Sequence, residues 1–153
     1  MRMSELADLY EAATKTFLTA ATGLSEKELD TAPAGEWTPR QVIHHMAHSD
    51  AYCLTRIIQM LSEPGTGIRS FSEAALVNSK VLAYSTTPIE PSIGLLKATR
   101  AESLRLLHAA DDEDLARTCN HSVLGEVTME AMILHFIDHP LGHAQQIVGS
   151  KVL

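Results

Sequence analysis

Apolar residues recur at steps of three and four along several long segments of this chain, and that spacing limits its possible folds more than any other feature. In the first segment the apolar set comprises Leu6, Leu9, Tyr10, Ala13, Phe17 and Ala20. A helix places residues three and four apart on one face, so this set forms a single buried stripe. Aromatic residues make up only 5% of the chain, and the remaining Leu, Ile, Val, Ala and Met suit helix packing better than sheets. The sequence therefore predicts an all-α protein.

The best-marked helix start lies at Thr38. This residue fits an N-cap, Pro39 occupies the first helical position, and Gln41 completes a T-x-x-Q capping box. The helix is expected to run through Leu61 and to stop before Pro64.

Similar signals predict the bounds of the other helices, for example Ser4 as an N-cap and Gly23 as the end of the first helix. Long helices are expected at 4–23, 38–61, 91–110 and 128–148, a single turn after the S-x-x-E box at 25–28, a short helix at 72–84 after a possible box at 70–73, and an acid-rich polar loop at 111–126. No repeat or interdomain linker interrupts them, and 153 residues suit one domain. We expect a single domain over residues 1–153, a four-helix bundle with one short extra helix in the crossover.

Charge and composition exclude several classes of protein. The net charge is −7 and the basic residues are scattered, which disfavours nucleic-acid binding. No apolar run approaches the roughly 20 residues of a membrane helix, and the N-terminus lacks the apolar core of a signal peptide. Cys53 and Cys119 lie far apart, and Cys53 falls on an apolar helix face, where it is interpreted as a core residue. A reducing cytoplasm is the expected location.

The chain contains eight histidines, which is the one unusual feature of its composition. Two of them, His139 and His143, are four residues apart on the last predicted helix. They project from one face, at the flank of its apolar stripe, whereas His135 drifts toward solvent. Two imidazoles at this spacing can chelate one ion, as in helical H-x-x-x-H zinc motifs. The spacing alone is equally compatible with two partly exposed histidines.

A second histidine group lies one turn into the helix at 38–61. His45 is nearest the edge of the apolar face, whereas His44 and His48 are interpreted as solvated surface. Asp50 falls inside the apolar stripe, where an unpaired carboxylate is costly. Its partner could be a ligand imidazole, a Trp N–H or an Arg.

Three blocks of the sequence together resemble the DinB/YfiT-like superfamily. They are LSEKELDTAPAGEWTPRQVIHHMAHSD (24–50), H-x-x-x-G-x-x-T (121–128) and HFIDHPLGHAQQI (135–147). The resemblance implies a four-helix bundle with up-down-down-up topology and three histidines around a nickel, zinc or similar ion. The matching positions are His45, His139 and His143, the same residues that helical phase favours. His121 matches a turn before the last helix and receives no catalytic role.

Pro140 departs from a regular last helix, because proline removes one helical hydrogen bond and tends to kink the chain between the two proposed ligands. Gly142 follows it, so the local geometry is expected to be irregular.

Three imidazoles with open coordination positions are typical of a catalytic rather than a structural site, and they suit zinc and nickel alike. The resemblance implies a metal-dependent enzyme acting on a small molecule, either a hydrolase or an S-transferase that uses a low-molecular-weight thiol as cosubstrate. The alternative is a non-catalytic, stress-induced metal-binding bundle. Family members are often dimers, and association would add burial to a core poor in aromatic residues, so a homodimer is expected.

Overall fold

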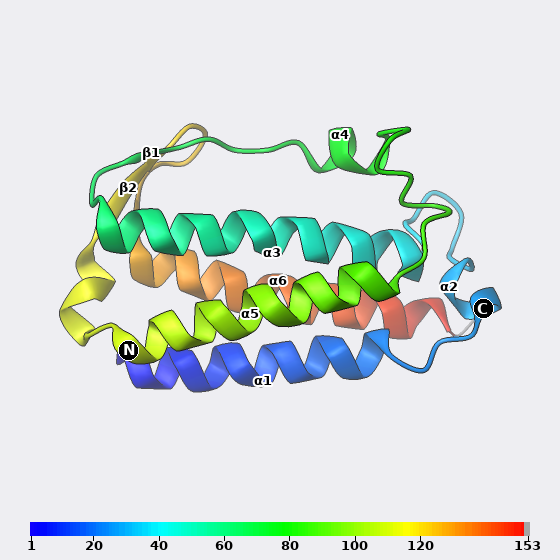
Figure 1. The fold of residues 1–153 in the computed structure, drawn as a ribbon, viewed down its shortest axis with the longest axis horizontal. Helices are drawn as coiled ribbons and strands as arrows, with labels where there is room; N and C mark the ends of the chain where they lie inside the picture. Colours follow the sequence, from blue (N-terminus) through cyan, green and yellow to red (C-terminus); the bar gives the residue numbers. More distant parts are fainter. Residues whose placement is uncertain (152–153) are drawn as a thin grey trace.

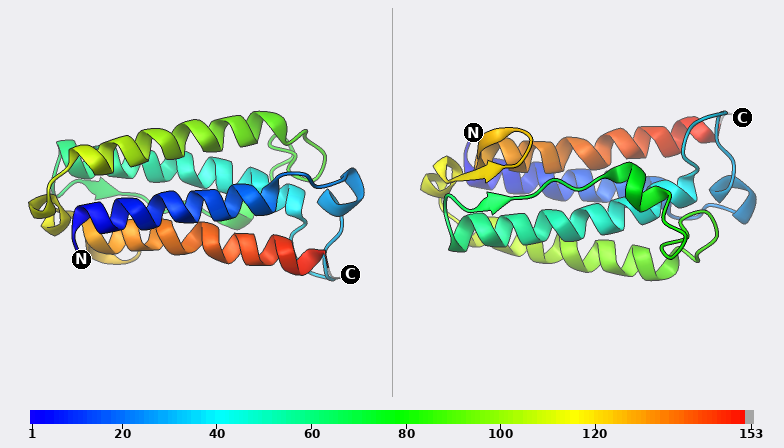
Figure 2. Two further views of the ribbon diagram at one scale, coloured as in Figure 1. Left: turned by 90° about the horizontal axis from the view of Figure 1, so that it is seen from below. Right: turned by 90° about the horizontal axis from the view of Figure 1, so that it is seen from above.

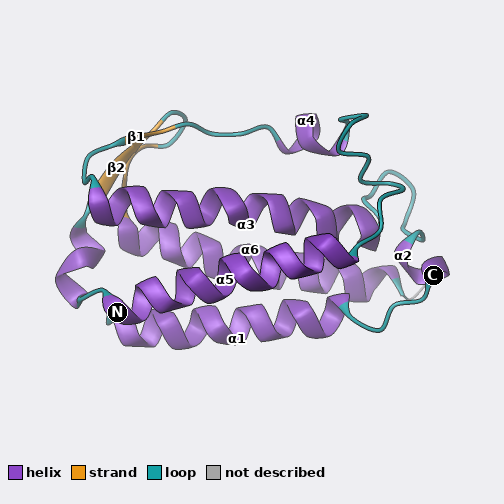
Figure 3. Ribbon diagram, viewed as in Figure 1, coloured by secondary structure: helices purple, strands orange, loops and turns teal. Residues whose placement is uncertain are grey.

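Four long helices form the body of the protein in the computed structural model, which describes residues 1–151 (Figure 1 and Figure 3). They are α1 (Met3–Ala21), α3 (Pro39–Ser62), α5 (Glu90–Ala109) and α6 (Met129–Ser150). Helices α1 and α6 run in one direction and α3 and α5 in the other, which confirms the up-down-down-up bundle (Figure 1). Helix α1 packs against α5 and α6, and α3 packs against the same two helices.

The predicted capping box at the start of α3 is present. Thr38 Oγ1 accepts a hydrogen bond from the Gln41 amide at 3.3 Å, and Gln41 Oε1 accepts one from the Thr38 amide at 2.9 Å. The box at 25–28 likewise opens the short helix α2 (Glu26–Leu29). Helix α1 begins earlier than predicted, because the Glu5 carboxylate accepts the N–H of Arg2 at 2.8 Å and makes Arg2 the N-cap instead of Ser4.

The crossover from α3 to α5 returns along the length of the bundle and, seen from above, runs between α3 and α6 (Figure 2). The helix predicted at 72–84 is shorter and comprises only α4 (Glu73–Val77). None of its side chains is buried, so packing stabilises no further turns. Its N-cap is Ser72, whose Oγ accepts a hydrogen bond from the Ala75 amide, and the proposed box at 70–73 is therefore wrong.

The prediction of a loop at 111–126 was also wrong in part. It holds a 3-10 helix η1 (Asp112–Ala116) and a hairpin of β2 (Thr118–His121) and β3 (Gly125–Thr128). Strand β1 (Gly67–Ile68) of the crossover pairs in parallel with β2, which fixes the start of the crossover to the hairpin. At the hairpin turn, His121 Nδ1 accepts hydrogen bonds from the backbone N–H groups of Val123 and Leu124, each at 3.2 Å.

Helix α6 continues unbroken through Pro140, which is buried. Proline has no N–H, so the carbonyl of Phe136, one turn earlier, loses its helical donor. The guanidinium of Arg100 replaces it, with Nη1 and Nη2 both 3.4 Å from the Phe136 oxygen. Arg100 Nη1 also donates to Asp50 Oδ1 at 2.9 Å, so the partner of Asp50 is an arginine and not a Trp N–H or a ligand imidazole.

The core lies between the four long helices and includes Cys53, which is 4% exposed, as predicted. Within residues 1–151, no helix combines the length and the apolar character needed to cross a membrane.

Candidate metal centre

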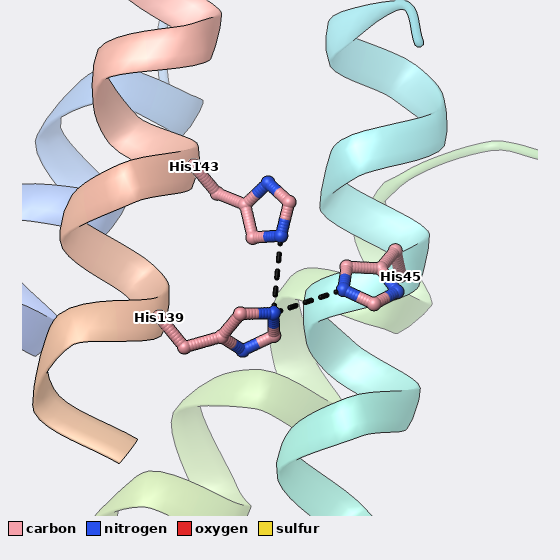
Figure 4. A group of neighbouring side chains, drawn as sticks. All are labelled: His45, His139 and His143. Carbon is pink, nitrogen blue, oxygen red and sulfur yellow. Dashed lines mark hydrogen bonds between the residues drawn. The ribbon is translucent and has the colours of Figure 1, made fainter. Parts of the chain in front are cut away.

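The three histidines selected from the sequence lie together between α3 and α6 (Figure 4). His139 Nε2 is 3.1 Å from His45 Nε2 and 3.1 Å from His143 Nε2. His45 is fully buried, whereas His139 and His143 are half-buried. Helices α3 and α6 are antiparallel neighbours, so one residue from α3 and an i, i+4 pair from α6 can face one point.

All three imidazoles are held in the neutral form. Burial lowers the pKa of His45 to about 4, and the nearby His143 and His48 lower it further. Burial also lowers the pKa of His139 to about 3, again with help from neighbouring histidines. The pKa of His143 is lowered by burial too. Neutral imidazoles each offer one lone pair, which is the form that binds metals.

Hydrogen bonding fixes the direction of the lone pair on His143. Its Nδ1 lies 2.8 Å from Gln146 Oε1, an acceptor, so Nδ1 carries the hydrogen and Nε2 presents its lone pair to the cluster. Gln146 was not selected from the sequence, although its position three residues after His143 is a usable signal. Nδ1 of His45 is buried and has no hydrogen-bond partner within residues 1–151.

The cluster fits a metal ion better than it fits a set of hydrogen bonds. Nε2 of His139 faces two other ring nitrogens, and one hydrogen cannot point at both of them. Without a metal, at least one contact would therefore bring two lone pairs or two N–H groups together. Nitrogen atoms that each bind zinc at about 2.0–2.1 Å lie roughly 3.3 Å apart in a tetrahedral site, close to the separations here.

Trp37 covers the cluster from the loop before α3. Its ring stacks over His143 with a centroid distance of 6.3 Å, and its centroid lies 5.0 Å from that of His45. The half-buried indole therefore borders the cluster on this side. The sequence interpretation had not placed Trp37 at the site.

The interpretation of His44 and His48 as solvated surface was wrong. His44 is 2% exposed, its Nδ1 lies 2.7 Å from Ser92 Oγ, and its Nε2 lies 2.9 Å from the Thr87 carbonyl oxygen. His48 is half-buried, and its Nδ1 lies 2.6 Å from the hydroxyl of Tyr84. Both histidines thus tie α3 to the end of the crossover, and His44 also ties it to the start of α5. The sequence pattern alone does not show that this face of α3 is covered.

One carboxylate and two cavities border the cluster. Glu73 at the start of α4 places Oε1 3.8 Å from His45 Nε2, and its side chain is 54% exposed. A cavity of about 330 Å³ includes His139 and His143 in its lining, and one of about 520 Å³ includes Glu73 and His135. His135 is exposed, as predicted, and stacks on His139 at 5.8 Å. The site is therefore open to small molecules.

Comparison with known proteins agrees with this architecture. The model of the DinB superfamily matches residues 9–147. A Bacillus cereus (strain 03BB102) protein named "Putative metal-dependent hydrolase" is 32% identical over 153 aligned residues, which cover 97% of this chain and 83% of that protein.

Solved structures share the fold. YfiT from Bacillus subtilis, described as "a probable metal-dependent hydrolase with an unusual four-helix bundle topology", matches with a TM-score of 0.88 and 24% identity over 98% of this chain and 86% of that one. The mycothiol-dependent maleylpyruvate isomerase matches with a TM-score of 0.76 and 14% identity over 96% of this chain and 61% of that one. On the family match and the 32% identity, this chain belongs to the DinB superfamily.

Proposed function

We propose that His45, His139 and His143 hold one divalent metal ion, zinc or nickel, and that the protein is a metal-dependent hydrolase. The observation that carries this proposal is the convergence of three neutral imidazole nitrogens within 4.8 Å of one another. The name of the Bacillus cereus relative supports the same class of reaction. When bound, such an ion supplies a Lewis acid that polarises an electrophile and makes a water or a thiol more acidic.

The residues around the cluster have separate roles in this proposal. Gln146 keeps the lone pair of His143 directed at the site, and Trp37 keeps water from one side of it. Glu73 is the carboxylate near the cluster on its open side, so it is placed to accept a proton from the attacking water. The proton then returns to the leaving group as the ester or amide bond breaks.

Transfer of a low-molecular-weight thiol is the second candidate. Cys53 and Cys119 are both buried, and burial raises the pKa of each thiol, so neither is suited to act as the nucleophile. Thiol chemistry would therefore need an external thiol in the open site. The likeness to the mycothiol-dependent isomerase concerns the fold alone, but it makes this reaction worth testing.

Cobalt-substituted protein separates the two reactions. Titration with bacillithiol, mycothiol, glutathione or cysteine should add a near-ultraviolet sulfur-to-metal band if a thiol binds, and conjugation of a model electrophile should rise in parallel. A panel of esters and amides tests hydrolysis on the same preparation, with and without a chelator. Hydrolysis that the chelator abolishes, without a thiol-induced band, supports the hydrolase. If metal-loaded protein catalyses neither reaction, the protein is a non-catalytic metal-binding bundle.

A further inference from the structure

A cavity of about 520 Å³ lies beneath the crossover, beside the histidine cluster. It lies between the crossover, the β2–β3 hairpin, α3 and α6, the region seen from above in Figure 2. The residues used here from its lining are Arg56, Phe71, Glu73, Val123, Leu124 and His135. Glu73 and His135 mark the end next to the cluster, because they contact His45 and His139 respectively.

Arg56, on α3, places an uncompensated positive charge on this cavity. It is 8% exposed, and no carboxylate lies within 4.0 Å of its guanidinium among residues 1–151. Its Nη2 donates to the carbonyl of Arg69 at 3.3 Å, and its Cζ lies 5.3 Å from the centroid of the Phe71 ring.

The other two buried arginines of the described chain are both paired. Arg40 contacts Glu26 and Asp30, and Arg100 contacts Asp50. Arg56 has no such partner within the described residues, and a guanidinium that faces a cavity suits a carboxylate because it can donate two parallel hydrogen bonds. The exception at Arg56 therefore points to an anion supplied by a ligand.

The rest of the lining favours an apolar ligand body. Val123 and Leu124 at the hairpin tip are 72% and 68% exposed, although both are large aliphatic residues. Exposed apolar side chains gathered at the rim of a cavity are typical of a binding surface. The ring of Phe71 adds an apolar wall next to the guanidinium.

The dimensions and charges of the cavity orient the ligand. Arg56 follows His45 by eleven residues on α3, which is about 16 Å along a helix, and its side chain leans back toward the helix start. The carboxylate of Glu73 at the cluster end repels a second carboxylate. The anionic end of the ligand thus belongs at Arg56 and its neutral, reacting end at the histidines.

We propose that this cavity is the substrate subsite and that it takes an elongated apolar carboxylate, with the carboxylate on Arg56 and the bond to be attacked at the histidine cluster. The position of the reacting end rests on the proposed function, whereas the recognition of the carboxylate by Arg56 does not.

Binding of octanoate and of its neutral isostere octanamide tests the subsite. Both are titrated by NMR into the zinc-loaded and the metal-free protein. The wild type should bind octanoate about 10-fold more tightly than octanamide in both forms, as expected for one added charged contact in a cavity. Equal affinities for the two ligands, or binding of neither, would overturn the proposal.

Substitutions test whether Arg56 causes the preference for octanoate over octanamide. Arg56→Met should bring the two affinities together, Arg56→Lys should keep part of the preference, and Arg105→Met, at an exposed arginine paired with Glu102, should leave it unchanged. Leu124→Glu, at an exposed hairpin position that should not affect folding, should weaken octanoate more than octanamide. A preference that survives in Arg56→Met contradicts the assignment.

The same titrations separate the subsite from the proposed function. If the protein takes up no zinc but still prefers octanoate, the metal proposal fails and the subsite stands. If it takes up zinc and shows no preference, the subsite fails and the metal proposal stands.

Discussion

Replacing Arg100 with methionine should be among the most destabilising single changes in the described chain. Its side chain is 1% exposed, and that of Asp50 is 3% exposed, so the variant leaves a buried carboxylate without its partner. Breaking a buried ion pair in this way costs about 3–5 kcal/mol. The Phe136 carbonyl also loses its donors, because Pro140 cannot supply one, which adds about 1 kcal/mol.

Urea unfolding at pH 7, followed by circular dichroism, measures this loss. We expect the free energy of unfolding to fall by about 5 kcal/mol, a large part of the roughly 5–15 kcal/mol that holds a domain together. The matched control is Arg105→Met on the same helix, an exposed arginine whose loss should cost less than about 0.5 kcal/mol.

The pH dependence gives the sign of the effect. Burial raises the pKa of Asp50 to about 6, while Arg100 opposes that rise. A carboxyl whose pKa is higher in the folded state than the usual 3.8 stabilises the fold below that value and loses this contribution as the pH rises through about 6. Without Arg100 the pKa rises further, so the variant should be closer to the wild type at pH 5 than at pH 8.

A second substitution tests the cause. Adding Asp50→Asn to Arg100→Met removes the stranded charge and should restore much of the lost stability. A loss below about 1 kcal/mol in the single variant at pH 7, or a loss that grows at pH 5, refutes the reasoning.

Two substitutions follow from the structure, and the oligomeric state expected from the sequence can be measured directly. His44→Ala should cost about 2–3 kcal/mol in urea unfolding, because it leaves Ser92 and the Thr87 carbonyl without their partner, and an unchanged midpoint would contradict this role. Glu73→Gln should lower kcat for a hydrolysed ester about 100-fold while metal content stays constant, and undiminished kcat would exclude Glu73 as the base. Sedimentation equilibrium at micromolar concentration should show a homodimer, and a single 16.7 kDa species would refute that expectation.

The long helices could be predicted because their signals are local. The box at Thr38 and Gln41 lies within four residues, and the apolar spacing of each helix is visible in one window of sequence. The same helical spacing predicted that His45 faces the core and that His139 and His143 share one face of their helix. All three lie where helical phase placed them.

The features that were missed depend on contacts between distant parts of the chain. His44 is bonded to Thr87 of the crossover and to Ser92 of α5, both more than forty positions away, and no helix wheel contains that information. Strand β2 is short and polar, so its sequence resembles a loop. It forms a strand because it pairs with residues 67–68 as well as with its hairpin partner, and the pairing with 67–68 is distant in sequence. The unbroken course of α6 through Pro140 depends on Arg100 from α5, which supplies the missing donor.

Metal analysis of the protein purified without an affinity tag tests the central claim most directly. After dialysis against zinc or nickel, elemental analysis should find one equivalent per chain in the wild type. The variants His45→Ala, His139→Ala and His143→Ala should each lose it, whereas His48→Ala, one turn from His45 and bonded to Tyr84, should keep it. Full metal occupancy in His139→Ala, whose nitrogen lies between the other two, would contradict the assignment.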